Sequence, residues 1–371
     1  MFTTVNLPGR LHRRNPDLAY RLRVHDVVFA PLSTLGERIT ALGANKLLVL
    51  ASSDRHLAPL RAALARFELT VIDRARVHVP AETVDAAATV LASAGADTLI
   101  AIGGGSPIGL GKALRLSHDV RFVAVPTTYA GSERTQMYGI TRAGDKQTGR
   151  DERVRPDLVL YDLALTQDMP LTISVQSLCN ALAHVISVLS TDSLAEPARS
   201  QALVAARETV RAIEELIGAP RDRPARGAAQ RAASECAALY DQGKAGVQHA
   251  LAHLLGGAFD LEHAALHALL LPQFLAHLQR TRPALVDELQ QAIGEPELRV
   301  HERPTIRDLA EAVQEARTVA ALPALGARLH GLLVAAHAPV TLTRLGVKRE
   351  ALERLLASRP ELPAQIALDA I

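Results

Sequence analysis

Short apolar runs alternate with helical patterns between Val24 and Ile140. The run Leu47–Ala51 is fully apolar and bounded by polar residues, which is typical of a buried parallel strand. The same alternation predicts further strands at Leu69–Ile72, Thr98–Ile102 and Phe122–Pro126, separated by helices at Leu57–Phe67, Ala81–Ala94 and Pro107–Leu116. Repeated strand–helix–strand units predict a doubly wound parallel sheet with ligands at the carboxyl ends of its strands.

From Leu163 onward the pattern changes to helices with short connections, and it predicts no further strand. The expected helices lie at Ser177–Val188, Thr305–Ala320, Ala324–Ala336 and Lys348–Ser358, with irregular connections at Gly218–Arg226 and Glu295–Pro304. We therefore predict an α/β protein with two domains. A dinucleotide-binding α/β domain would span residues 1–162, and an all-helical substrate and catalytic domain would span residues 163–371.

Composition narrows the possible classes of protein. The 371 residues are 48% hydrophobic and 22% charged, which is ordinary for a globular protein with ample core. A formal net charge of only +2, without a basic block, argues against nucleic-acid binding. Two cysteines favour a reducing compartment, the start of the chain lacks a secretion signal, and the apolar run Leu266–Leu271 is too short to span a bilayer. We expect a cytoplasmic protein without a membrane partner.

Histidines are concentrated in one stretch of the second half. They form two pairs, each with a spacing of four residues: His249 and His253, then His263 and His267. Residues four apart share one face of a helix, and we expect Gly256-Gly257 to end the first helix and Pro272 to close the second. A single helical histidine more often caps, packs or faces solvent. Two pairs joined by a tight loop instead predict a site where imidazoles meet.

A second candidate site follows the third predicted strand, where Gly103-Gly104-Gly105-Ser106 leads into a helix through Pro107. Glycines let the backbone approach an anion closely, and a helix N-terminus offers free N–H groups, so this stretch can cradle a phosphate. A plain tight turn is the alternative, and the stretch is neither GxGxxG nor a P-loop. The next strand ends in the hydroxyl-rich loop Pro126–Glu133 at the same edge of the sheet. The two loops predict one shared crevice.

Taken in order, these motifs resemble the iron-containing alcohol dehydrogenase superfamily. Within it, maleylacetate reductases are the most similar. The resemblance is carried by Gly103–Ala113, Ala124–Glu133, Asn180–His184, His249-x-x-x-His253 and Gly256–Pro272, and it extends from about Val27 to Pro272. It implies a nucleotide-binding α/β domain, a helical C-terminal domain and an active site in the cleft between them.

The resemblance also implies roles for single residues. NADH or NADPH would contact Gly103, Gly104, Gly105, Ser106, Thr127, Thr128, Ser132, Lys146 and Ser52. Lys146 matches a family lysine near the cofactor, and Ser52 stands where many members carry an aspartate that repels a 2′-phosphate. The metal ligands of metal-dependent members match Asn180, His184, His249 and His263, while His253 matches the histidine beside the nicotinamide.

The expectation about a bound divalent metal ion depends on Asn180. A neutral amide removes the anionic ligand of the site, and maleylacetate reductases typically carry this same asparagine, so we expect a divalent metal to be unlikely, although three histidines can still bind zinc. A conjugated ketone that accepts hydride at an alkene carbon builds charge on its oxygen, which imidazoles can stabilise and protonate. We assign proton delivery first to His253, with His184, His249 and His263 lining the site.

The expected substrate is an unsaturated oxo-dicarboxylic acid, whose carboxylates need cations. Candidates within sequence reach are Arg134, Arg142, Lys112 and Lys244, although a solvated surface charge is the commoner role for each. Leu178, Ser187 and Arg134 depart from the pattern of the maleylacetate reductases. Three functions therefore remain: reduction of maleylacetate to 3-oxoadipate in aromatic degradation; reduction of another carbonyl or enoyl acid in biosynthesis; or a redox-silent descendant with ligand-binding or non-redox function. We expect a homodimer.

Overall fold

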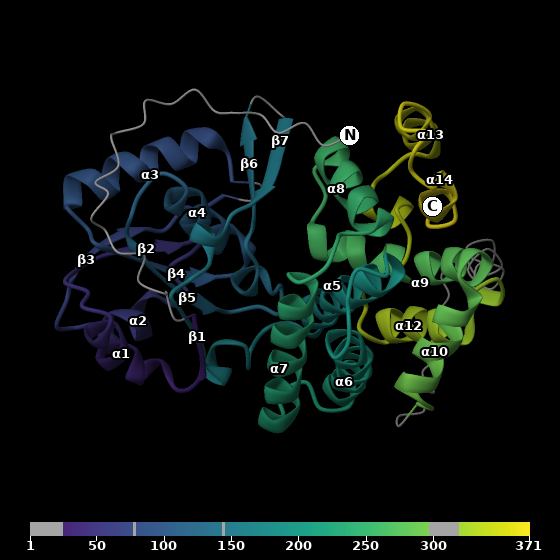
Figure 1. The fold of residues 1–371 in the computed structure, drawn as a ribbon, viewed down its shortest axis with the longest axis horizontal. Coiled ribbons are helices and arrows are strands. Elements are labelled where there is room, and N and C mark those ends of the chain that lie inside the picture. The colour runs from purple at the N-terminus through teal and green to yellow at the C-terminus, as the bar shows by residue number, and fades with distance from the viewer. Residues whose placement is uncertain (1–24, 77–78, 143–144, 297–318) are drawn as a thin grey trace.

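The computed structural model describes residues 25–76, 79–142, 145–296 and 319–371. A sheet flanked by helices forms one half of the molecule, and helices alone form the other (Figure 1). The predicted fold class, an α/β half followed by a helical half, is confirmed. The predicted connection Glu295–Pro304 and the predicted helix Thr305–Ala320 lie largely outside the described residues. The boundary at residues 162 and 163 stays a prediction.

Six parallel strands form the sheet in the order β1-β8-β5-β4-β2-β3. They are β1 (Asp26–Phe29), β2 (Lys46–Ala51), β3 (Glu68–Ile72), β4 (Thr98–Gly103), β5 (Arg121–Pro126) and β8 (Leu158–Tyr161). The four predicted strands correspond to β2 through β5. From β2 the chain moves outward to β3 and then crosses back to β4, on the other side of β2. The direction of winding therefore reverses between β2 and β4, which is where such sheets bind their ligands.

Helices cover both faces of this sheet (Figure 1). One face carries α1 (Leu35–Ala41) and α2 (Leu57–Ala63), and the other carries α3 (Ala81–Ala94) and α4 (Gly105–Arg115). Successive residues of β2 point to opposite sides, so Leu47 and Val49 enter one apolar cluster while Leu48 and Leu50 enter the other. Burial of both faces explains why the central strands are apolar throughout rather than alternating. Short 3₁₀ turns complete the connections in the described part of the chain: η1 (Leu32–Thr34), η2 (Ser132–Arg134), η3 (Glu152–Val154), η4 (Leu163–Leu165) and η5 (Thr343–Leu345).

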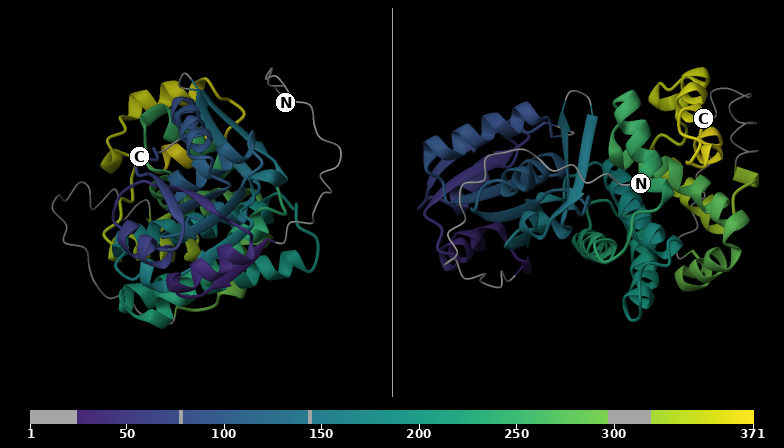
Figure 2. Two further views of the ribbon diagram at one scale, coloured as in Figure 1. Left: turned by 90° about the vertical axis from the view of Figure 1, so that its left-hand side faces the viewer. Right: turned by 45° about the horizontal axis from the view of Figure 1, so that its top comes forward.

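An antiparallel hairpin stands beside the helical half, apart from the main sheet (Figure 2). Its strands are β6 (Met137–Arg142) and β7 (Asp145–Arg150), paired from Met137 with Arg150 to Arg142 with Asp145. The hairpin was not predicted, because β7 is polar and β6 is only partly buried, so neither strand shows an apolar run.

The helical half is built around α5 (Leu171–Ser190), most of whose residues are buried. It packs against α6 (Ala198–Gly218), α7 (Arg223–Tyr240), α8 (Val247–Phe259) and α9 (His263–Thr281). Outside these lie α10 (Pro283–Ile293), α12 (Ala324–Ala335), α13 (Arg349–Ala357) and α14 (Ala364–Leu368). By length and composition α5 alone, within the described part of the chain, could cross a membrane; here it is the core helix of this half.

Several predicted helix boundaries were wrong, and three of them have a clear physical reason. Gly256-Gly257 does not end α8, which continues to Phe259 and stops at Asp260, a residue with φ of 52°. Pro272 does not close α9, because it lies inside that helix with its neighbours buried in the core, and this burial offsets the hydrogen bond that proline removes. The connection predicted at Gly218–Arg226 is shorter, since the Asp222 carboxylate caps α7 by accepting from the Ala225 N–H at 2.9 Å.

Candidate active site

The glycine-rich stretch after β4 forms the start of α4. This helix begins at Gly105, two residues before the predicted start, and Gly104 is its N-cap. No side chain caps it, so the N–H groups of the first turn are open to an anion at the carboxyl edge of the sheet. The left-handed backbone lies at Gly103, with φ of 142°, whereas Gly104 has φ of −86°. Position 103 thus requires glycine because of its positive φ, whereas position 104 requires glycine because a side chain there would have little room.

The neighbours of these glycines define a cradle. A Cβ atom at Gly104 would lie 3.2 Å from Cγ2 and 3.3 Å from Oγ1 of Thr128, in the loop after β5. A Cβ atom at Gly103 would lie 3.6 Å from the Ser52 hydroxyl, which follows β2. Ser52, Gly103 and Thr128 therefore meet at the point where the direction of winding reverses. The predicted cofactor residues of these three loops lie side by side.

The loop after β5 joins this cradle to the helical half. Thr128 Oγ1 accepts from the Ala130 N–H at 3.4 Å, and the Ala130 carbonyl accepts from Asn180 Nδ2, on α5, at 3.3 Å. The next residue, Gly131, has φ of 78°, and a Cβ atom there would lie 2.5 Å from Cβ of Ala237 on α7. One loop thus contacts the cradle on one side and α5 and α7 on the other.

Histidines from α5, α8 and α9 meet in one cluster, as the paired spacing predicted. The ring centroids of His184 and His249 are 5.1 Å apart, and those of His253 and His263 are 4.9 Å apart. The ring of His249 lies 5.9 Å from that of His253 and 5.8 Å from that of His263. His184 and His249 are buried, His263 is half-buried and His253 is exposed. The cluster therefore opens to solvent at His253.

The most deeply buried ring of the cluster is His267, which was noted for its spacing but not among the predicted site residues. Its ring centroid lies 4.1 Å from that of His249 and 4.3 Å from that of His263. Tyr240, the last residue of α7, was also missed; its ring stacks on His184 with centroids 4.5 Å apart. The spacing of four residues carried the signal for His267, whereas Tyr240 reaches the cluster only through tertiary packing.

Burial controls the charge of the innermost rings. It lowers the pKa of His184 to about 3, with a smaller effect from the nearby His253. Burial also lowers the pKa of His267 well below its usual value, and the neighbouring histidines, His249 foremost, lower it further. Both rings are neutral at neutral pH. His253 is exposed and can exchange protons directly with water.

The predicted cationic candidates are dispersed. Burial lowers the pKa of Lys112 to about 7, and its Nζ donates to the carbonyls of Thr135 and Met137, both at 2.8 Å, so this side chain braces the chain leading into β6. Arg134 lines a cavity of about 660 Å³ formed by β1, α6 and α7. Arg142 and Lys244 are exposed. Lys146 lies on β7, but its side chain is outside the described part of the protein.

Two of the three departures from the maleylacetate reductase pattern have structural roles. Leu178 is fully buried in the core of the helical half. The Ser187 hydroxyl accepts from the Gly246 N–H at 2.6 Å and so holds the start of α8 against α5. Neither side chain is among the ring contacts of the cluster. Arg134, the third departure, lines the cavity formed by β1, α6 and α7.

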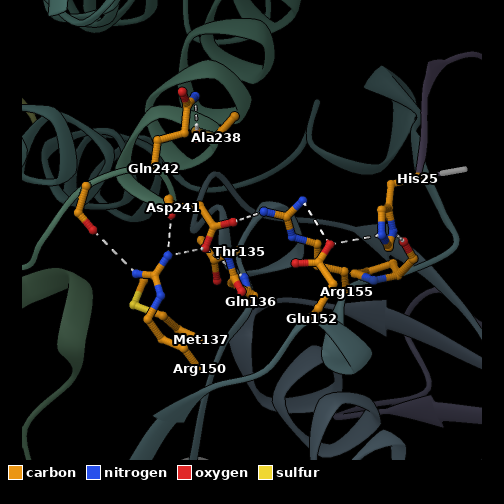
Figure 3. A network of polar contacts seen from close by, with 12 residues as sticks. His25, Thr135, Gln136, Met137, Arg150, Glu152, Arg155, Ala238, Asp241 and Gln242 are labelled. Carbon is orange, nitrogen blue, oxygen red and sulfur yellow. Dashed lines mark hydrogen bonds and ion pairs between the residues drawn. The ribbon is translucent and has the colours of Figure 1, made fainter. Parts of the chain in front are cut away.

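Asp241 connects the two halves beside this site (Figure 3). Its carboxylate, 1% exposed, accepts from the Gln136 N–H at 2.9 Å and from Arg150 of β7 at 3.2 Å. Arg155 donates to its other oxygen and also pairs with Glu152 at 3.5 Å. The end of α7 is thereby held against the hairpin and the chain that precedes it.

Two family models match this chain: iron-containing alcohol dehydrogenase over residues 25–163, and the C-terminal part of the Fe-containing alcohol dehydrogenase family over residues 174–358. The chain belongs to the iron-containing alcohol dehydrogenase family. It is 39% identical to the maleylacetate reductase of Pseudomonas knackmussii over 282 residues, 73% of this chain and 80% of that protein. It is 37% identical to the maleylacetate reductase of Burkholderia cepacia over 325 residues, 85% of this chain and 89% of that protein.

Solved structures agree with this assignment. The crystal structure of maleylacetate reductase from Agrobacterium tumefaciens matches with a TM-score of 0.78 at 29% identity, covering 94% of this chain and 96% of that one. The chain is thus an oxidoreductase similar to maleylacetate reductases. The expected family membership and enzyme class are confirmed.

The donors of the cluster do not fit the carboxylate-containing metal site that the family name implies. Asn180 supplies a neutral amide, whose Nδ2 is used by the Ala130 carbonyl and whose Oδ1 has no hydrogen-bond partner. Among the described residues, the donors close enough to hold one ion are His249, His263 and His267, with nitrogens within 4.8 Å of one another and no anion among them. Iron(II) sites of oxygen and nitrogen donors usually include a carboxylate.

Proposed function

We propose that this protein uses NADH or NADPH to reduce the activated C=C bond of maleylacetate to 3-oxoadipate. The observation that carries the proposal is the loop after β5, which contacts Gly104 of the cradle and Asn180 beside the histidines. A nucleotide site and an imidazole cluster are thereby neighbours. The identity of 36–40% to several maleylacetate reductases supports the choice of substrate.

The chain's own residues would hold the nucleotide at the sheet edge. The open N–H groups at Gly105 and Ser106 suit its phosphates, with Gly103 and Gly104 allowing close approach. The hydroxyls of Ser52, Thr127, Thr128 and Ser132, together with Lys146, complete the proposed contacts. When bound, the reduced nicotinamide supplies the hydride.

The histidines would manage the charge and the proton. As hydride reaches the alkene carbon, negative charge develops on the ketone oxygen, and N–H groups of the cluster stabilise it. His184 is neutral, so it can act there only as a neutral donor. His253 is the exposed member and would deliver the proton, which it recovers from water. His249 and His263 line the same site.

We further propose that this reaction needs no divalent metal. Asn180 offers no charge, so three neutral imidazoles alone would have to offset the desolvation of an ion. Protein purified with excess chelator should keep its activity. Stoichiometric iron or zinc in protein prepared without added metal, together with loss of activity on chelation, would contradict this proposal.

A direct assay tests the function. The absorbance of NADH or NADPH is followed with maleylacetate as substrate, and the product is identified as 3-oxoadipate. A panel of simple ketones, aldehydes and enoyl acids serves as the comparison. Turnover on another acid of that panel, but not on maleylacetate, would move the assignment to a different substrate. Nucleotide binding without any turnover would indicate a redox-silent protein.

We also propose a cytoplasmic homodimer. β1 is an edge strand of the sheet. Its last residue, Phe29, is 45% exposed, Val204 of α6 is 47% exposed, and both line the cavity of about 660 Å³. Exposed apolar side chains gathered at one place are typical of protein interfaces. Sedimentation of the protein and of Phe29→Glu tests this, and a wild-type monomer would contradict it.

A further inference from the structure

A hydrogen-bonded chain of three side chains, Gln248–His267–His263, leads from the buried side of the histidine cluster to half-buried His263. Gln248 is in the first turn of α8, His263 begins α9, and His267 follows one turn later. Gln248 Oε1 lies 2.9 Å from His267 Nδ1, and His267 Nε2 lies 3.0 Å from His263 Nε2. Gln248 and His267 are both completely buried. Each of these contacts requires one donor and one acceptor.

The amide of Gln248 determines which atom donates. Its Nε2 donates to the main-chain carbonyl of His267 at 3.4 Å, and a carbonyl can only accept. The opposite orientation of the amide would set two oxygens against each other. Gln248 Oε1 therefore faces the ring, and His267 Nδ1 must carry the hydrogen. Because an unpaired charge is costly in so buried a position, His267 is neutral and its Nε2 holds a lone pair.

The tautomer of His263 follows. His263 Nε2 must donate to the lone pair of His267, so the basic nitrogen of neutral His263 is Nδ1. We propose that His267, held by Gln248, is a positioning residue that keeps His263 in the Nε2–H tautomer. In this tautomer Nδ1 is the His263 ring nitrogen that carries no hydrogen. This inference rests on the proposed reductase function, in which His263 lines the reacting site.

Two other roles for His267 conflict with this geometry. A proton wire would need a further acceptor beyond Gln248, but both ends of that amide are already engaged with His267. A metal held through Nε2 of both His263 and His267 would have to break the bond between those two nitrogens. The chain therefore resembles the arrangement in which a third group orients a catalytic base.

Ring-nitrogen NMR of the ¹⁵N-histidine-labelled resting protein tests the tautomers without substrate. We expect His263 and His267 to be neutral, with the hydrogen on Nε2 of His263 and on Nδ1 of His267. The His267→Leu spectrum identifies the coupled ring, since His263 should lose its fixed tautomer. A wild-type His263 with the hydrogen on Nδ1, or a His267 protonated on both nitrogens at neutral pH, would overturn the proposal.

Kinetics of two variants separate positioning from packing. His267→Leu removes the acceptor, and we expect kcat to fall at least about tenfold, as when a group that orients an active-site ligand is lost, with the KM for the nucleotide unchanged. His267→Gln can keep an acceptor toward His263 and should recover much of the loss. His330→Leu, at a similarly buried histidine of α12, is the control and should keep kcat.

Equal loss of kcat in both His267 variants would overturn the positioning role. The tautomers are measured independently of turnover. A wild-type protein inactive on maleylacetate but with the expected tautomers would therefore contradict the proposed substrate, whereas an active protein with different tautomers would contradict the positioning role alone.

Discussion

Gly104→Val tests the phosphate cradle most directly. A Cβ atom at this position would already lie 3.2 and 3.3 Å from the side chain of Thr128, closer than ordinary van der Waals contact. Valine adds two methyl groups beyond that Cβ. The backbone at Gly104 does not require glycine, since its φ is −86°, so the effect comes from space alone. The start of α4 and the loop after β5 must then move apart.

The size of the effect follows from what that displacement removes. Overpacking of this kind costs folding about 1–3 kcal/mol, which leaves a folded protein. Loss of two backbone N–H bonds to a phosphate, at about 1.5–3 kcal/mol each, weakens nucleotide binding by about 3 kcal/mol or more. At 1.4 kcal/mol per factor of ten, this corresponds to a Kd for NADH raised about 100-fold or more.

Titration calorimetry with NADH and NADPH measures this change, and thermal unfolding establishes that the variant is folded. Gly331→Val is the matched control, because Gly331 lies exposed on α12, where a Cβ atom would have no neighbour within 4 Å. It should leave the affinity unchanged. A folded Gly104→Val protein that binds both nucleotides with wild-type affinity would refute the assignment of the cradle.

Three further predictions concern the coenzyme, the metal and the contact between the two halves. Ser52 places no carboxylate after β2, so NADPH should bind within about a hundredfold (~2.7 kcal/mol) of NADH, as competitive calorimetry would show. Asn180→Asp restores an anionic ligand one turn from His184, so its affinity for zinc and iron, measured by equilibrium dialysis, should rise; unchanged affinity would contradict the ligand assignment. Asp241→Asn removes the charge that pairs with Arg150 and Arg155. Denaturant unfolding should show that the free energy of unfolding falls by about 1–3 kcal/mol. An unchanged free energy of unfolding would contradict a stabilising role for this contact.

The fold could be predicted best where burial of a strand or helix produces an apolar run in the sequence. The inner strands β2, β4 and β5 are buried between helices on both faces, so their apolar runs are visible in the sequence. The hairpin strands are polar or only partly buried, so they show no such run. The edge strand β1 is only four residues long and exposed at both ends. The strand β8 is apolar and buried but also only four residues long, and it was not predicted. The prediction from Pro272 failed for the opposite reason. Burial of α9 in the core stabilises the helix by more than the proline destabilises it locally.

The site shows the same division between local and tertiary information. A spacing of four residues predicted two pairs of neighbouring histidines, His249 with His253 and His263 with His267, because residues four apart share one face of any helix. The contact of His267 with His249 depends on how α8 crosses α9. The stacking of Tyr240 on His184 depends on where α7 ends against α5. Neither helix contact leaves a local pattern in the sequence. The sequence alone could therefore identify histidines as site residues, but not which rings contact one another.

The neutral side chain of Asn180 and the neutral ring of His184 are consistent with each other, and this bears on catalysis. A carboxylate at position 180 would attract either a cation or a proton to the buried ring of His184, one turn away. With Asn180 there, burial, with a smaller effect from His253, lowers the pKa of His184 and favours the neutral ring. In the proposed mechanism the buried imidazoles remain neutral without a bound ion, and the proton for the reduction would enter at exposed His253. Asn180 would thus favour proton delivery by histidine over attraction of a cation.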